Sequence, residues 1–181
     1  MLTEHQKSTG RFARHTYSTR PRRTNVAGKI DARLAELGIT LPDAPAPAAN
    51  YIPYVVTGNL VIISGQIPME GGALAVTGYV GDGNVTEDHA IAEARKCAIN
   101  LLAQLNAATG GNLDRVKRVV KLGGFVASAT DFTNQPKVIN AASDLMVDVF
   151  GEAGRHARFA VGASALPLGC VVEIEGMFEI E

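Results

Sequence analysis

The chain of 181 residues contains no tryptophan, few aromatic residues and only two cysteines. Cys97 and Cys170 provide neither a dense disulfide framework nor the spacing of a metal site, which favours a reducing compartment. Both fit packing positions better than nucleophile positions. No apolar run approaches the roughly 20 residues needed to span a bilayer. These absences predict a soluble, cytoplasmic protein without a membrane segment.

Charge is distributed unevenly along the chain. The formal net charge is −1, yet residues 1–25 hold six basic side chains and one acidic side chain, a local balance of +5. This leader has no apolar segment of the secretory kind, so it does not fit a signal peptide. A transit peptide, a nucleic-acid contact and an arm lying on the acidic remainder of the chain all fit its composition. The absence of aromatic interleaving favours the arm.

The length allows one domain of ordinary size after this leader. Residues 26–49 predict a short helix, with Asn25 as N-cap and Gly38 as stop, followed by an extended Pro/Ala connector. Residues 50–181 then form the main domain. Its hydrophobic patterns predict, in order, a hairpin around Gly58-Asn59, a short strand near 74–79, a helix from Thr86 to Gly110, a strand over 117–128, a helix from Asn134 to Gly151, and strands near 158–163 and 172–180.

This order predicts an α+β fold in which one mixed sheet carries both long helices on one face. Adjacent glycines inside the third long strand, Gly123 and Gly124, indicate a bulge or a close backbone approach. His89 fits a surface position in the first helical turn, because no second ligand lies at a useful metal spacing. No metal site is therefore expected.

The other face of the sheet is expected to carry Arg158, Lys121, Glu173 and Glu175 among apolar side chains. Such a face is too apolar to be left to water, which predicts self-association. An arginine and a glutamate on adjacent strands can bind a small carboxylate and handle a proton. The alternative interpretation is a solvated sheet face with incidental ion pairs.

Several ordered motifs resemble the RidA/YjgF group, the reactive intermediate deaminases, some of which also carry endoribonuclease or translation-inhibitor labels. The motifs are SGQIP at Ser64–Pro68, a strand from Lys121 ending in Asp131-Phe132, Val138-Ile139-Asn140, Arg158-x-x-Val161, Leu166-Pro167 and Glu173-Ile174-Glu175. The similarity covers about residues 50–181. It implies a chorismate-mutase-like fold, a homotrimer that trimerises through the open sheet face, and ligand clefts between subunits.

The resemblance also implies an activity: hydrolysis of reactive enamines and imines to 2-oxo acids and ammonia without a cofactor. Arg158 matches the arginine that grips the substrate carboxylate, and Glu173 matches the glutamate of water activation and proton transfer. The remaining matched positions of the cleft are Tyr51, Ser64, Gly65, Asn140 and Ala160. A guanidinium fork suits a planar carboxylate.

Departures from the group's pattern leave alternatives open. Ala160 stands where the group often has cysteine, and the interval from Asn140 to Arg158 is one residue longer. A non-catalytic trimer that binds a small carboxylate, or an RNA-binding or ribonuclease-like protein, also fits the sequence. Retention of both Arg158 and Glu173 favours the enzyme, because carboxylate binding alone requires the arginine and not the glutamate.

Overall fold

The structure, a computed structural model, describes residues 28–44, 50–81 and 84–181. The basic leader and part of the connector lie outside the described residues. The N-cap of the first helix is Gly28, so the expectation that Asn25 caps it was wrong. The elements are α1 (Lys29–Glu36), β1 (Tyr54–Thr57), β2 (Leu60–Gln66), β3 (Met69–Glu70), β4 (Ala73–Leu74), α2 (Glu87–Ala108), η1 (Leu113–Arg115), β5 (Val116–Ala127), α3 (Gln135–Phe150), η2 (Gly151–Gly154), β6 (Ala157–Ala163), η3 (Pro167–Gly169) and β7 (Val172–Ile180).

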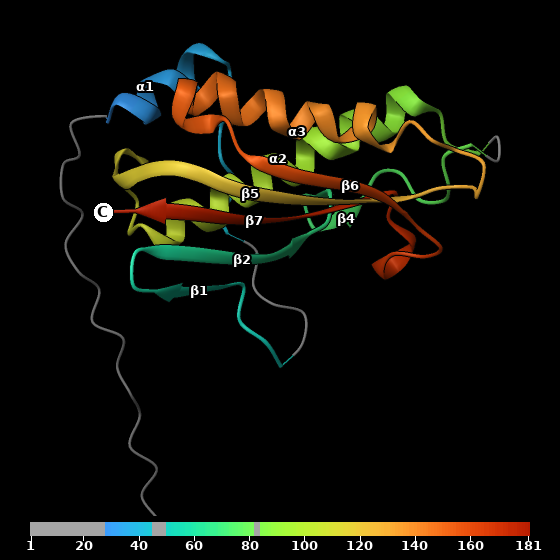
Figure 1. The fold of residues 1–181 in the computed structure, drawn as a ribbon, viewed down its shortest axis with the longest axis horizontal. Helices are drawn as coiled ribbons and strands as arrows, with labels where there is room; N and C mark the ends of the chain where they lie inside the picture. The colour runs from blue at the N-terminus through green and yellow to red at the C-terminus, as the bar shows by residue number, and fades with distance from the viewer. Residues whose placement is uncertain (1–27, 45–49, 82–83) are drawn as a thin grey trace, which may run out of the picture.

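Five strands form one mixed sheet in the order β1-β2-β7-β5-β6 (Figure 1). All neighbours are antiparallel except β5 and β6, which are parallel. Helix α2 packs on β2 and β7, while α3 packs on β5 and β6. The α+β fold with two long helices on one sheet face is therefore confirmed, and α1 adds a third helix against α3.

The sequence sets the ends of both long helices. Thr86 caps α2, since its hydroxyl accepts a hydrogen bond from the backbone N–H of His89, and two acidic residues follow in the first turn. Helix α3 has Pro136 in its first turn and ends at Gly151, whose φ of 62° suits glycine. These ends agree with the predicted ones.

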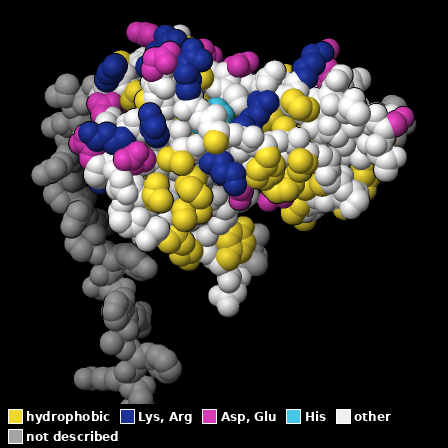
Figure 2. Space-filling view, in the orientation of Figure 1, with side chains coloured by type: hydrophobic (Ala, Val, Ile, Leu, Met, Phe, Trp, Pro, Cys, Tyr) yellow, Lys and Arg dark blue, Asp and Glu magenta, His cyan; other side chains and the backbone are white. Residues whose placement is uncertain are grey.

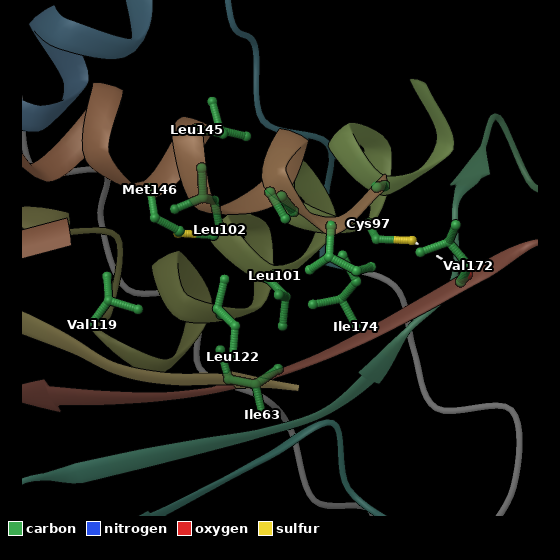
Figure 3. Packing of buried hydrophobic residues seen from close by; sticks show 14 of the residues in the cluster. Ile63, Cys97, Leu101, Leu102, Val119, Leu122, Leu145, Met146, Val172 and Ile174 are labelled. Atoms are coloured by element: carbon green, nitrogen blue, oxygen red, sulfur yellow. Dashed lines mark hydrogen bonds between the residues drawn. The ribbon is translucent and has the colours of Figure 1, made fainter. Parts of the chain in front are cut away.

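The core lies between the helices and one sheet face (Figure 3). Along β7, alternate residues are buried, so Val172, Ile174 and Phe178 point into the core while Glu173 and Glu175 point to the opposite face. The thiol of Cys97 is buried and donates to the carbonyl of Val172. Burial raises the pKa of Cys97 well above its usual value and that of Cys170 to about 11. Both cysteines are thus thiols at packing positions.

Helix α1 is fastened to the domain by its N-terminus. The Asp114 carboxylate accepts hydrogen bonds from the backbone N–H groups of Lys29 (2.9 Å) and Ile30 (2.8 Å). Arg33 Nε donates to the Asp148 carbonyl at 2.7 Å. Gly38 follows the helix with a φ of 68°, as expected for a helix stop.

Two expectations about strands were wrong. The strand expected near 74–79 is only the two-residue β4, which pairs with β3. The strands around Arg158 and Glu173 are not neighbours, because β5 lies between β6 and β7. A local reading favours a hairpin for two strands joined by a short turn, but here both strands pair with the long central β5 instead.

The glycine pair in β5 permits close packing on both faces. A Cβ at Gly124 would lie 2.6 Å from Ile139 Cγ1 of α3, and a Cβ at Gly123 would lie 2.6 Å from a ring carbon of Phe159. No register shift occurs between these glycines, so close approach rather than a bulge explains them.

We expect Gly124→Ala to lower the free energy of unfolding by about 1–3 kcal/mol, since the added methyl overpacks the contact with Ile139. Ile139→Ala alone leaves a cavity and costs about 2–5 kcal/mol. The double variant should lose less than the sum of the two, because the shortened side chain makes room for the methyl. Denaturant unfolding of all four proteins measures this coupling; strictly additive losses would contradict the proposed contact.

Candidate functional site

Arg158 lies on the helix side of the sheet. Its backbone pairs with buried Leu122, and its guanidinium reaches α3, where Nη1 donates to Asn140 Oδ1 (2.9 Å) and Ser143 Oγ (3.0 Å). Nη2 donates to the Pro136 carbonyl at 3.4 Å. The expectation that Arg158 shares a sheet face with Glu173 was therefore wrong. The physical reason is the period of two along β6, which sends Arg158 toward α3 and Phe159 to the open face.

Glu173 lies on the open face beside Gly65 of β2. A Cβ at Gly65 would overlap the Glu173 carboxylate, so glycine leaves the space that this side chain fills. Burial raises the pKa of Glu173 above its usual value of 4.5, and the neighbouring Glu175 raises it further. A carboxylate with a raised pKa accepts a proton more readily than an ordinary glutamate does.

A cavity of about 280 Å³ opens next to Gly65, and Tyr51 contributes to its wall. Tyr51 is 49% exposed. Asn100 of α2 lies at the inner wall, and its Nδ2 donates to the carbonyls of Ile67 (2.9 Å) and Met69 (3.1 Å). Asn100 therefore holds the chain that follows β2 in the shape that forms the cavity.

Leu168 also lines this cavity, although it comes from the turn between β6 and β7. It is 75% exposed and has a φ of 56°, the left-handed conformation that leucine seldom adopts. Such strain, about 1–2 kcal/mol for a residue with a side chain, is typical of functional loops. Nothing in the sequence indicated a site at Leu168, although Gly169, which follows it, indicates a turn.

The other expected site residues occupy different places. The Ser64 hydroxyl donates to the Ile52 carbonyl at 3.0 Å, which ties the approach to β1 onto the end of β2. Asn140 contacts Arg158 directly. Ala160 of β6 pairs with Gly124 of β5 and points to the same sheet face as Arg158. The structure thus divides the candidates between a group around Arg158 at α3 and a group around Glu173 at β2.

The open face carries both charge and apolar surface. Lys121 Nζ lies 4.0 Å from Glu175 Oε1 and 5.1 Å from the Phe159 ring centre, and Phe159 packs edge-on against Phe125. Figure 2 shows hydrophobic side chains gathered over the strands. Exposed apolar residues of this face are Val55, Ile62 and Val161. This combination fits a face covered by another molecule better than one left in water.

Within one chain, the guanidinium of Arg158 and the carboxylate of Glu173 do not meet. Because β5 lies between β6 and β7, these two strands run about 10 Å apart, and the two side chains leave from opposite faces of the sheet.

The 28–44, 50–81 and 84–181 segments contain no cluster of three or more His, Cys, Asp or Glu side chains suited to a metal ion. Among the helices of these segments, none has the length and apolar character needed to cross a bilayer.

The pKa of Glu173 predicts how stability changes with pH. Because the folded state raises this pKa, ionisation of Glu173 disfavours folding; the cost is absent below pH 4.5 and grows as pH rises through the raised value. We expect Glu173→Gln to be more stable than the parent at pH 7, with a difference that shrinks toward pH 4. Denaturant unfolding at both pH values measures it. A variant less stable than the parent at pH 7 would show that Glu173 is held by a cation.

Comparisons with known proteins agree on one family. The family model for YjgF/chorismate-mutase-like proteins, which also carries an endoribonuclease label, matches residues 31–179 and so begins inside α1, earlier than the motifs suggested. Protein TCP17 of Trypanosoma cruzi is 48% identical over 85% of this chain and 96% of its own length. The 2-iminobutanoate/2-iminopropanoate deaminase of Dermatophagoides farinae is 32% identical over 79% of this chain and 95% of its own.

A solved structure supports the same assignment. The protein Atu1372 of Agrobacterium tumefaciens, whose function is described as unknown, is 51% identical and has a TM-score of 0.78; the match covers 84% of this chain and 92% of that one. Sequence motifs, sheet order and these relatives lead to one conclusion: the chain belongs to the YjgF/RidA family.

Proposed function

We propose that this protein is a cofactor-free hydrolase that converts reactive enamines and imines of amino acids to 2-oxo acids and ammonia. The observation that carries the proposal is that the chain has both an anchored guanidinium, that of Arg158, and a carboxyl group of raised pKa, that of Glu173. The deaminase of Dermatophagoides farinae, 32% identical to this chain, supports the same reaction class.

The division of the two groups between opposite sheet faces supports a site between subunits. In this proposal, Arg158 of one subunit and Glu173 of the next face one cleft, whose wall includes Tyr51 and Gly65. The partly apolar open face, which needs a cover, supports the homotrimer expected from the family. In such a trimer, Arg158 of each subunit acts together with Glu173 of a neighbouring subunit.

The reaction assigns one role to each group. Arg158 binds the substrate carboxylate through parallel N–H donors and fixes the imine carbon next to Glu173. The Glu173 carboxylate takes a proton from a water molecule while the oxygen of that water bonds to the imine carbon. The resulting carboxylic acid then returns the proton to the nitrogen. Glu173 then carries the hydroxyl proton of this carbinolamine to the nitrogen, so that the carbon–nitrogen bond breaks, ammonia leaves and the carbonyl of the 2-oxo acid forms. An enamine first gains a proton on carbon to become the imine.

The alternative is a binding protein without turnover, since members of the family carry names other than deaminase. Such a protein needs Arg158 for its carboxylate ligand but gains nothing from a proton-handling group at Glu173. The raised pKa of Glu173, caused mainly by burial, favours the enzyme, since a group that only binds cations would be stabilised in its charged form.

The test is release of 2-oxo acid from freshly generated imines of several amino acids. We expect Arg158→Lys to raise KM strongly, by about tenfold or more, because lysine keeps the charge but loses the two parallel donors. Glu173→Gln should instead lower kcat by about 10² or more while carboxylate binding survives. A parent protein without turnover, or a Glu173→Gln variant with unchanged kcat, would contradict the proposed mechanism.

A further inference from the structure

Arg158 is held by one stripe of helix α3. The three groups that accept its hydrogen bonds belong to Pro136, Asn140 and Ser143, which are spaced by four and three residues and therefore share a helix face. Asn140 and Ser143 together occupy the two hydrogens of Nη1. Within the described residues, no protein group accepts a hydrogen bond from Nε. Nε–H and the second hydrogen of Nη2, which form one edge of the guanidinium, are thus left available to a planar carboxylate.

Ser143 connects Arg158 to a histidine. Its hydroxyl oxygen accepts from Arg158 Nη1 at 3.0 Å and lies 3.0 Å from His156 Nε2. His156 Nδ1 lies 2.6 Å from the Gly154 carbonyl oxygen. A carbonyl oxygen only accepts, so Nδ1 carries the hydrogen and Nε2 of the neutral ring is an acceptor. The hydrogen bonds therefore run in one direction, from Arg158 to Ser143, then to His156, then to Gly154.

The end of this chain is fixed by close packing. A Cβ at Gly154 would lie 2.6 Å from the carbonyl carbon of Met146, so η2 approaches α3 more closely than another residue permits. This contact sets the direction of the Gly154 carbonyl, which selects the tautomer of His156. The tautomer in turn makes the Ser143 hydroxyl donate to the ring and present its lone pair to Arg158.

We propose that Ser143 and His156 are positioning residues that hold Arg158 with its Nε and Nη2 edge turned to the substrate carboxylate. The proposal rests on the proposed function, in which Arg158 binds that carboxylate. In this proposal, Ser143 and His156 touch no substrate and act through Arg158. Because all three residues belong to one chain, Arg158 is oriented before a second subunit completes the cleft.

Steady-state kinetics with imino acids test the role of Ser143. We expect Ser143→Ala to raise KM by about fivefold to tenfold, because a hydrogen bond to a charged group is lost, while kcat changes less than about twofold. Ser143→Thr keeps the hydroxyl and should restore the parent KM. Equal KM values for Ser143→Ala and the parent would overturn the proposal.

Two polar replacements of similar size form a matched pair at His156. His156→Gln places an amide oxygen near the position of Nε2 and should keep the parent KM. His156→Asn reaches only the position of Nδ1, loses the acceptor for Ser143, and should raise KM as Ser143→Ala does. The double variant Ser143→Ala/His156→Asn should be no worse than Ser143→Ala, since both break one chain. Additive losses would overturn the proposal.

A readout that is independent of turnover separates this proposal from the proposed function. ¹⁵N NMR of the histidine rings, with His156 assigned by its loss in His156→Gln, should show the Nδ1-protonated tautomer in the parent and in Arg158→Lys. An Nε2-protonated ring would reverse the bond to Ser143 and overturn the positioning role. A parent that shows the expected tautomer but releases no 2-oxo acid would refute the proposed function alone.

Discussion

The pairing of β5 with both β6 and β7 is the constraint on which the rest of the structure depends. Because β5 lies between them, the two strands that carry Arg158 and Glu173 are separated, and the alternation of side chains sends these residues to opposite faces. Arg158 is thereby delivered to α3, which anchors its guanidinium. Glu173 is delivered to the open face, where burial and Glu175 raise its pKa. In the proposed function, each of these two positions is a half-site.

Each half-site is prepared by packing inside its own chain. The close approach of α3 to Gly124 brings the helix near enough for Asn140 and Ser143 to reach Arg158. On the other side, the absence of a side chain at Gly65 gives Glu173 its place, and Asn100 shapes the adjoining cavity. These rigid supports fit a site in which orientation and proton transfer matter more than a cofactor.

The sequence predicted the elements well because their signals are local. The apolar stripes of α2 and α3, the cap at Thr86 and the hairpin turn at Gly58 each depend on residues close together in the chain. The prediction that β6 and β7 are neighbours was wrong, because the parallel pairing of β6 with β5 is a long-range contact that no local pattern encodes. Arg158 and Glu173 were identified by resemblance to the family. Their placement on opposite faces required the strand order.

Other contributors to the candidate site were missed for related reasons. His156 and Ser143 are thirteen positions apart, and only the turn of η2 brings them together. Ser143 could have been found from the sequence, because it lies three positions after Asn140 and therefore on the same face of the helix. Leu168 offered none, since its backbone conformation is set by the surrounding turn.

The central claim, that two chains share each site, is tested by mixing two inactive variants. Arg158→Ala and Glu173→Gln subunits, unfolded together in equal amounts and refolded, should form mixed oligomers in which about a quarter of the sites combine an intact Arg158 with an intact Glu173. Light scattering gives the mass of the assembly, and 2-oxo acid release gives its activity. We predict a trimer that regains about a quarter of the parent kcat. A monomer, or a mixed trimer as inactive as either variant alone, would contradict a site shared between subunits.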